Sequence, residues 1–563
     1  MARRYRPVDR DQVFLLPPSM IDWPPEDHLV WFVIEAVRRL DTTRFPARAR
    51  LGGVGRRGYD PDMLVTLLVY AMAHGVRSSR RIERLCHTDV AFRIICAADV
   101  PDHTVLARFR QHHEAALADL LTATLRLCAE LGMVRLGVVA LDGTKIAANA
   151  SRDANRTEAG LRRLAEQHLA ESAATDQSED ALFGVGVRGD EVPEKLRDRT
   201  HRGARIGQAL QQIEQREAAA RDRAEQRQAE ADAYTRALAL PDRPPRGGVP
   251  KAVDPVAAAP ARLDRERARA QARSDAWHAK ADAAAANGHR LPGTRPAPVD
   301  EHHLVRTARA AYDAARATAP ATEQPTEHSG GTAENRGDAT HPGDRTADRT
   351  GEQARHATAA PTANLTDPDS RVLKTRNGWV QGYNCQTATS EDQFFVHAQA
   401  TQDANDIHQF APTATAVSTA AEQLARHTGR DDLNMGTVLA DAGYDSDDNL
   451  TAPGPDRLIA NAKRHTITQR AATDPATADP PGEATARHQM DHRLRTADGQ
   501  QLYQRRAPLV EAPNAWLKDG RGLRQFARRG LSAANSELRF ACAVTNLLRL
   551  RARGITTTRL ATG

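Results

Sequence analysis

The sequence predicts a mixed α/β protein, with an all-α domain before its sheet and a long insertion within it. Two apolar runs, residues 138–141 and 437–440, each lead into an aspartate with a glycine close behind. This pattern is typical of short buried strands that end at the edge of a sheet. Helix-start signals recur through residues 1–135, and strand patterns are missing between about 152 and 364. At 563 residues, the chain is long enough for several domains.

Composition narrows the class of protein. The net charge of +6 is modest and permits an anionic partner such as nucleic acid. The cysteines form no CxxC pair, which indicates a reducing compartment and argues against structural zinc. Neither a signal peptide nor an 18-residue apolar run is present, so we expect no membrane partner and a cytoplasmic, nucleoid-associated protein. The five cysteines are Cys86, Cys96, Cys128, Cys385 and Cys542.

Residues 1–135 are predicted to form a helical domain. Amphipathic residues 28–40 follow two prolines, Asp60 and Pro61 start a second helix, and Ser78 or Ser79 starts a third. A long helix is expected from about 101 to 132. Short helices with clustered arginines favour a helix-turn-helix-like DNA-binding unit, although a bundle with a solvated basic face fits the same pattern. The candidate DNA contacts in this domain are Arg80, Arg81, Arg84, Arg108 and Arg110.

The first strand, expected at 136–141, places Asp142 at its end, and residues 136–151 form the first piece of a catalytic core. Residues 152–364 form the insertion. A thin apolar stripe over 206–238 predicts a long helix, which we expect to pair with a second helix at 262–286. Residues 318–361 have almost no large apolar side chain, so disorder is predicted there.

Residues 365–553 complete the core and 554–563 form a tail. Strands are expected at 379–389, 394–400, 437–440 and 457–461. Asp406 is interpreted as the cap of a helix over 407–427, and Asp403 as a loop residue. The region 466–499 is expected to be irregular. A helix is expected from about Val510, with Pro513 in its first turn, and a last helix capped by Ser532 from 533 to 553.

Without the insertion, the core reads strand, strand, strand, helix, strand, strand, helix, which is the order of an RNase-H-like sheet. Asp142 and Asp441 then lie side by side at one edge. Two adjacent carboxylates repel each other unless protons or cations lie between them. Because carboxylates are hard oxygen ligands, Mg²⁺ or Mn²⁺ is the expected cation.

Several motifs resemble those of the DDE transposases of bacterial insertion sequences. The resemblance spans about 1–151 and 365–553, and 60–135 is similar to the helical N-terminal domain of that family. The motifs are Val-Ala-Leu-Asp-Gly-Thr-Lys-Ile at 139–146, Asp-Pro-Asp-Ser-Arg at 367–371, Val-Gln-Gly-Tyr-Asn at 380–384, Ala-Asp-Ala-Gly-Tyr at 440–444, and Val-Glu-Ala-Pro at 510–513, followed by Lys518 and Gly-Leu-Arg-Gln-Phe at 522–526.

The resemblance implies that Asp142, Asp441 and Glu511 are the catalytic triad and hold two Mg²⁺ (or Mn²⁺) ions. It implies cleavage at the ends of the element and transfer of the freed 3′-OH into target DNA. The partners would be DNA, at terminal inverted repeats and at the target, and further copies of the chain, as a homodimer or larger synaptic complex. Lys518 matches the lysine that the family places after the glutamate. Tyr503 and Arg506 lie one residue further from Glu511 than that family pattern expects.

Two other interpretations stay open from the sequence. The chain could be a catalytically inactive DNA-binding repressor of its own element, or an RNase-H-like nuclease without strand transfer. Glu537 on the last helix is the nearest competitor to Glu511 for the third carboxylate.

Overall fold

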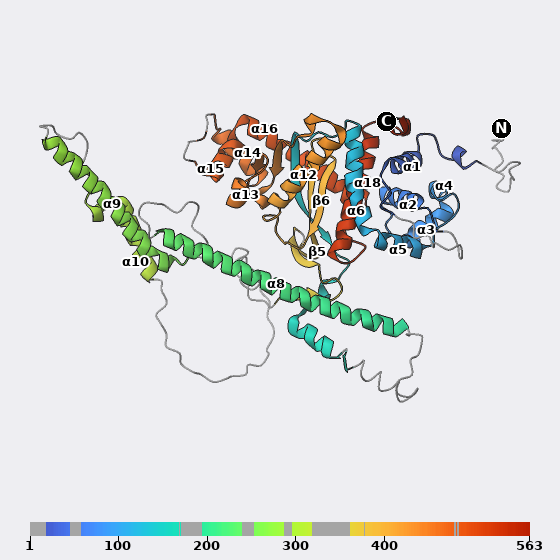
Figure 1. Ribbon diagram of the computed structural model, residues 1–563, viewed down its shortest axis with the longest axis horizontal. Coiled ribbons are helices and arrows are strands. Elements are labelled where there is room, and N and C mark those ends of the chain that lie inside the picture. Colours follow the sequence, from blue (N-terminus) through green and yellow to red (C-terminus); the bar gives the residue numbers. More distant parts are fainter. Residues whose placement is uncertain are drawn as a thin grey trace, which may run out of the picture. The chain divides into compact units, whose positions relative to one another are not determined.

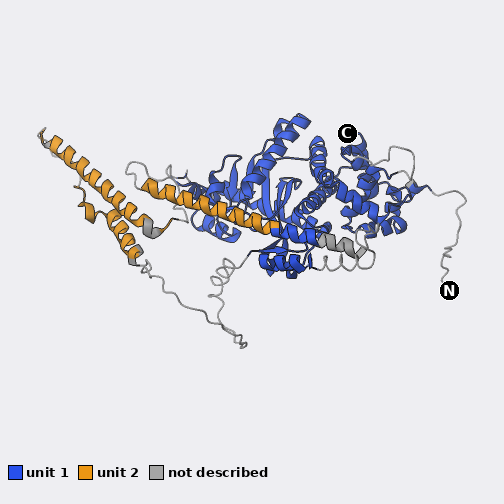
Figure 2. Cartoon of the chain, turned by 60° about the horizontal axis from the view of Figure 1, so that its bottom comes forward, with its two compact units in different colours: residues 1–210, 361–563 blue, residues 211–360 orange. Residues whose placement is uncertain are grey.

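The computed structural model describes residues 19–45, 58–167, 169–170, 194–238, 253–286, 295–317, 361–376, 378–477, 480 and 484–562. The chain divides into two compact units, residues 1–210 with 361–563, and residues 211–360 (Figure 2). The first unit contains the sheet and the helical domain that precedes it. The predicted disordered stretch lies outside the described residues from 318 to 360.

The helical domain begins with short elements whose starts follow from the sequence. Asp60 caps α2 through the N–H of Asp62, with Pro61 in the first turn, and Ser78 caps α3 through the N–H of Arg81. The prediction of one long helix from about 101 to 132 is wrong. The chain forms two helices, which are separated at His113, and the His113 ring packs against Phe109. The elements are η1 (Met20–Asp22), α1 (Leu29–Arg39), α2 (Pro61–Ala73), α3 (Ser79–Thr88), α4 (Val90–Ile95), α5 (His103–His112) and α6 (Glu114–Glu130).

A mixed six-stranded sheet forms the centre of the first unit. Its order is β4-β5-β1-β7-β8, and β6 pairs with β5. β1 runs antiparallel to β5 and parallel to β7, and β8 is parallel to β7. This sheet, with helices on both faces, confirms the predicted fold class. The strands are β1 (Val138–Ala147), β4 (Arg371–Thr375), β5 (Gly378–Ser390), β6 (Phe395–Thr401), β7 (Thr437–Ala440) and β8 (Arg457–Ile459).

The first strand is longer than predicted. It does not end at Asp142 but continues to Ala147, because β5 pairs with it from Val139 to Ala147. Only its first part, up to Ala140, also pairs with β7. Asp142 therefore lies in mid-strand, at the point where the neighbouring parallel strand has ended.

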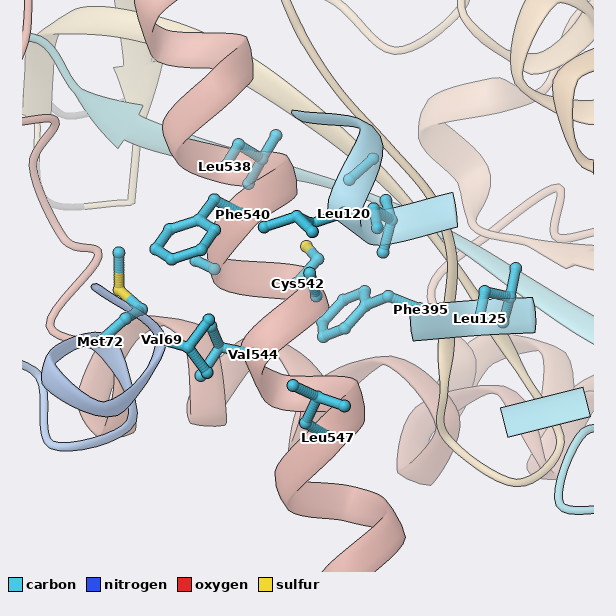
Figure 3. Packing of buried hydrophobic residues seen from close by; sticks show 14 of the residues in the cluster. Val69, Met72, Leu120, Leu125, Phe395, Leu538, Phe540, Cys542, Val544 and Leu547 are labelled. Carbon is cyan, nitrogen blue, oxygen red and sulfur yellow. The ribbon is translucent and has the colours of Figure 1, made fainter. Parts of the chain in front are cut away.

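Helices cover the two faces of the sheet and separate its core into two clusters. α6, α12 and α18 pack on one face, where α18 contacts both α6 and β6 (Figure 1). Figure 3 shows this contact, with Cys542 and Leu547 of α18 beside Phe395. On the other face α15, α16 and α17 lie over β1, β5 and β8. Their bounds are α12 (Phe410–Thr428), α15 (Ala486–Arg495), α16 (Ala497–Gln504), α17 (Arg506–Ala515), α18 (Leu531–Ala552) and α19 (Thr557–Thr562).

The region expected to be irregular, 466–499, is helical in large part. α14 (Arg464–Thr473) and α15 contribute few apolar residues, but Ile467, Met490 and Leu494 are buried against β8 and its neighbours. Tertiary packing of these three side chains explains helices that the polar sequence did not predict. The small elements near the second strand end are η4 (Asp431–Leu433), η5 (Ala442–Tyr444) and α13 (Asp447–Thr451).

The helix that carries Glu511 begins earlier than predicted, at Arg506, so Pro513 lies in its last turn. A proline there cannot donate to the carbonyl four residues earlier, that of Leu509. The hydroxyl of Thr389 on β5 donates to this carbonyl at 2.7 Å instead. The sheet thereby satisfies the group that the proline leaves free, and a π-helical turn, η6 (Trp516–Gly520), follows directly.

The insertion leaves the core through a small two-stranded sheet. β2 (Asn155–Thr157) pairs antiparallel with β3 (Thr362–Asn364), just after the short turn η2 (Arg152–Ala154). Asn364 also donates to the carbonyl of Ser151 at 2.8 Å. The two ends of the insertion are therefore held together, whatever lies between them.

The described residues of the second unit are mainly helical. α8 (Glu194–Leu238) starts in the first unit and runs into the second, and α9 (Pro255–Ala286) and α10 (His303–Ala317) follow. The predicted pairing of the helices over 206–238 and 262–286 is wrong. α9 packs instead against α10 and the short η3 (Val299–Glu301), through Leu263, Ala270 and Val305. None of the helices in the described part of the chain is long and apolar enough to cross a membrane.

The link between Thr389 and Pro513 yields a stability prediction. Thr389→Val should lower the free energy of unfolding by about 1–3 kcal/mol, because the buried carbonyl of Leu509 loses its donor. Adding Pro513→Ala should recover most of this loss, since an alanine N–H can donate to the same carbonyl. Urea unfolding of the two single variants and the double variant measures the coupling. An equal cost of Thr389→Val with Pro513 or Ala at that position would contradict the assignment.

Candidate active site

Two aspartates meet at the edge where β7 ends. β1 and β7 run parallel in register, with Ala140 opposite Leu439, so the chain positions two residues further on, Asp142 and Asp441, lie side by side. Asp441 is the N-cap of η5, and its Oδ1 accepts the N–H of Gly443 at 2.9 Å. This turn fixes the direction of the second carboxylate.

One guanidinium nitrogen connects the two carboxylates. Nη2 of Arg506 lies 2.6 Å from Oδ1 of Asp142 and 3.2 Å from Oδ2 of Asp441. These two oxygens are thus at most about 5.8 Å apart, the sum of the two distances. Arg506 is largely buried, whereas 42% of the Asp441 side chain is exposed. A cation thus lies between the two acids, and one side of the pair is open to solvent.

The other oxygen of Asp142 has its own donor on the same helix. Nδ2 of Asn514 donates to Oδ2 of Asp142 at 2.7 Å. Two buried atoms beside it, Oδ1 of Asn514 and Nε of Arg506, have no hydrogen-bond partner among the described residues. An unfilled acceptor next to an acid pair suits a hydrated cation, whose water would supply the missing donor.

The pKa of Asp142 differs from that of an ordinary carboxyl. Burial raises it to about 6, and the charge of Asp441 adds to the rise. The neighbouring Arg506 opposes this shift but does not cancel it. Asp142 is thus a carboxyl that loses its proton about two pH units higher than an ordinary aspartate, and a cation that approaches it would favour the ionised form.

Glu511 lies on the helix that supplies Arg506 and Asn514, but its side chain is exposed. It is three residues before Asn514, and residues at this spacing are neighbours on a helix surface. Glu511 is therefore close to Asn514 on α17, and it does not form a compact group with the two aspartates.

The only compact group of possible metal ligands in the described part of the chain is elsewhere, at Glu83, Asp102 and His103. Asp102 is the N-cap of α5 and Nδ1 of His103 lies 2.9 Å from Glu83 on α3. These contacts join two helices of the N-terminal domain, which accounts for the group without an ion.

Asp406 belongs to the carboxyl-terminal edge of the sheet, so its interpretation as a helix cap is wrong. α12 begins only at Phe410, after Gln409. Oδ1 of Asp406 accepts from Asn384 at 2.8 Å and from Gln386 at 2.7 Å, both on β5. It also lies 2.1 Å from where a Cβ on Gly143 would be, so a larger residue at 143 would displace Asp406 from its bonds to β5. A Cβ on Gly443 would lie 3.3 Å from Oδ2 of Asp406 and 2.9 Å from Oδ1 of Asp441. The charge of Asp406 also adds to the rise in the pKa of Asp142, so Asp406 is a third carboxylate near the acid pair.

The predicted DNA contacts of the helical domain differ in exposure. Arg80, Arg81 and Arg84 on α3 and Arg108 on α5 are exposed. Arg110 is half-buried and donates to the carbonyl of Arg77 at 2.6 Å. Lys518 is half-buried in η6, and its charge opposes the rise in the pKa of the buried Cys385 thiol.

Glu537, the competitor of Glu511, is in a different environment. It is buried on α18, where its Oε1 accepts from Nε of Arg77 at 2.9 Å and its Oε2 from the N–H of Ala527 at 3.0 Å. These bonds connect the helical domain to the core.

Comparisons with known proteins found two matches to protein families. A transposase domain (DUF772) matches residues 19–112, and a transposase DDE domain matches residues 468–551. The second match contains Arg506, Glu511 and Asn514, whereas Asp142 and Asp441 precede it. The comparison with curated proteins found no match, and neither did the comparison with solved structures.

The two matches and the RNase-H-like sheet define a DNA transposase. The chain belongs to the DDE transposases of insertion sequences, as its motifs predicted. DNA binding and the use of divalent metal follow at the level of the family.

Sequence reasoning missed three residues of this site, namely Arg506, Asn514 and Asp406. The spacing of Arg506 from Glu511 argued against a role for it. In a helix that begins at Arg506, Arg506 and Asn514 are eight residues apart and lie on one face. The spacing of four residues from Arg506 to Val510 and from Val510 to Asn514 is the sequence signal that could have identified both residues. The position of Asp406 depends on how a loop folds over two glycines, which the sequence does not reveal.

The raised pKa of Asp142 yields a prediction about stability in metal-free buffer. The folded protein holds this proton more tightly than the unfolded chain, whose aspartate pKa is about 3.9, so the contribution of Asp142 to stability is lost as the pH rises through about 6. Asp142→Asn does not titrate. The free energy of unfolding of Asp142→Asn minus that of the wild type should therefore increase between pH 4 and pH 7, by roughly 2–3 kcal/mol at most.

Urea unfolding of both proteins across this pH range is the measurement. Mg²⁺ added at pH 7 should stabilise the wild type and leave Asp142→Asn unchanged. A pH-independent difference between the two proteins would show that Asp142 titrates normally.

Proposed function

We propose that this transposase cleaves DNA at the ends of its insertion sequence and transfers the freed 3′-OH into target DNA, in one metal-dependent site. The observation that carries the proposal is the position of one Arg506 nitrogen between Asp142 and Asp441. Two acids that converge on one positive centre, at the open edge of an RNase-H-like sheet, are suited to holding a divalent cation.

The residues of the site fit this cation. Asp142, Asp441 and Glu511 would be its ligands, since all three offer hard carboxylate oxygens, as Mg²⁺ or Mn²⁺ requires. Two bound ions supply an activated water and stabilise the leaving oxygen in phosphodiester cleavage. Asn514 orients Asp142, and Arg506 neutralises the acid pair when no ion is bound.

The order of reaction follows from the chemistry of the substrate. Water attacks the phosphorus at the element end and breaks its bond to the 3′ oxygen. The resulting 3′-OH then attacks a phosphorus of target DNA and displaces another 3′ oxygen. Both steps exchange one oxygen for another at phosphorus, so one set of carboxylates serves both.

Recognition of DNA is assigned to the helical domain and to Lys518. The exposed arginines on α3 and α5 would contact the terminal inverted repeats, and Arg110 would contribute from the boundary with the core. Because an element has two ends, we propose that at least two copies of the chain act together, as a homodimer or a larger assembly.

Replacing either aspartate should abolish the chemistry and preserve DNA binding. We expect Asp142→Asn and Asp441→Asn to lower the cleavage rate by about 10²–10⁴-fold, since metal-ion catalysis contributes several kcal/mol. Asp447→Asn is the matched control, because this carboxylate is six residues from Asp441, is exposed and pairs with Arg487. Labelled duplexes from the DNA on either side of the gene, incubated with Mg²⁺ and a target plasmid, serve as substrate.

The products separate the possible functions. Cleavage with joining supports a transposase, cleavage alone a nuclease without strand transfer, and binding alone a repressor. Undiminished cleavage by Asp142→Asn would refute the site, and undiminished cleavage by Glu511→Gln would show that the third ligand is another residue.

A further inference from the structure

A second site is a cavity between the helical domain and the core, both within the first unit. Its volume is about 560 Å³ and it is open to solvent. Ser78 and Ser79 at the start of α3 and Gln111 of α5 line one side. The other side is lined by Asn149, Ala527, Arg528, Arg529 and Ala533. Its walls include parts of both segments that match transposase domains.

Positive charge dominates this cavity. Four arginines line it, against one glutamate, Glu114. Two of the arginines are neutralised, because Arg77 pairs with Glu537 and Arg528 pairs with Glu114. The other two, Arg110 and Arg529, bond to backbone carbonyl oxygens, those of Arg77 at 2.6 Å and of Asn149 at 3.1 Å. No carboxylate pairs with either of them in the described part of the chain.

Arg110 is close to two other arginines of the cavity, Arg77 and Arg528. Its pKa is lowered to about 10, mainly by burial and further by the charges of Arg528 and Arg77, against the attraction of Glu537. A guanidinium normally keeps its proton at any physiological pH. An anion in the cavity would relieve this repulsion, and it would also meet the N-terminal end of α3, where the helix dipole is positive.

We propose that this cavity binds a phosphate of the DNA backbone, and so connects the helical domain to the catalytic core on one DNA molecule. Arginine donates two parallel hydrogen bonds to phosphate oxygens, and the serines and Asn149 add neutral donors. The proposal rests on the proposed function, because it assumes that DNA is the substrate.

The bound phosphate is not the one that is cleaved. Asn149 follows β1, whose last residue, Ala147, is five strand positions beyond Asp142, or about 17 Å at the usual rise per residue. Along a DNA strand, about five nucleotides span this length at 3.4 Å each. The contact therefore positions the substrate and does not take part in the chemistry.

The test is the affinity of the full chain for end duplexes as a function of salt. Arg529→Ala is the main variant, because the side chain is exposed and its loss should not disturb folding. We expect about tenfold weaker binding at moderate salt and a salt slope smaller by about one, the value of one lost phosphate contact. Arg529→Lys should restore most of the affinity, and Arg110→Gln should weaken binding as well.

Arg524→Ala is the matched control, because Arg524 is exposed, pairs with Asp519 and does not line the cavity. It should bind within twofold of wild type. Thermal unfolding of each variant confirms that it is folded. End duplexes that each carry one neutral methylphosphonate, at a different position, locate the contact. At one position about five nucleotides from the cleaved bond, the modification should weaken binding by the wild type but not by Arg529→Ala.

Each other outcome overturns the proposal. If wild type binds and cleaves the end duplex and Arg529→Ala and Arg110→Gln do so equally, the cavity is not a DNA site, although the proposed function stands. If inorganic phosphate stabilises wild type but not Arg529→Ala, while both bind DNA alike, the cavity binds a free anion. If wild type binds no DNA, the proposed function fails, and this site fails with it.

Discussion

The mutual repulsion of two carboxylates on neighbouring parallel strands is the constraint on which this structure depends. Asp142 and Asp441 are close enough to contact one nitrogen, and burial already makes the first of them hard to ionise. A cation or a proton has to lie between them. In this structure Arg506 provides it, from a helix that the sheet itself holds through the bond from Thr389 to Leu509. The same helix carries Glu511, which we propose as the third metal ligand, so the position of α17 sets where Glu511 lies relative to the two aspartates.

In the proposed site, a divalent ion would compete with Arg506 for the same carboxylate oxygens. The guanidinium neutralises the pair in this structure, and it would have to give up at least one of its two contacts if an ion took the oxygens. Nε of Arg506 and Oδ1 of Asn514 have no hydrogen-bond partner among the described residues. Under the proposed function, metal binding and movement of Arg506 would therefore be linked.

Local sequence was sufficient for five of the six strands of the large sheet, in their order along the chain, and for the two neighbouring aspartates. Apolar runs that are followed by an acid and a glycine are short-range patterns. Local sequence was insufficient where contacts with a distant segment determine the length of a strand, the place of a proline in a helix or the position of a side chain. β1 extends past Asp142 because β5, more than 200 residues away, pairs with it. Pro513 is accepted late in its helix because a threonine on β5 takes the free carbonyl. Asp406 covers Gly143 because Asn384 and Gln386 hold it there, and no nearby residue signals that contact.

The insertion shows how such a core accommodates a long added segment. β2 and β3 join its two ends, so the strands on either side keep their places whatever the insertion contains. Closing a longer loop costs little, about 0.6 kcal/mol per doubling of its length. The second unit, with α9 packed on α10, adds a small apolar core of its own and does not depend on the sheet for it.

The most direct test of the central claim is to locate the metal. Crystals of the full chain grown with Mn²⁺, examined by anomalous scattering, would show where the ion binds. We predict density within bonding distance of one oxygen each of Asp142 and Asp441, with Glu511 turned toward it and Nη2 of Arg506 withdrawn from at least one aspartate. A Mn²⁺ peak elsewhere in the chain, with the bridge from Arg506 to both aspartates intact, would contradict it.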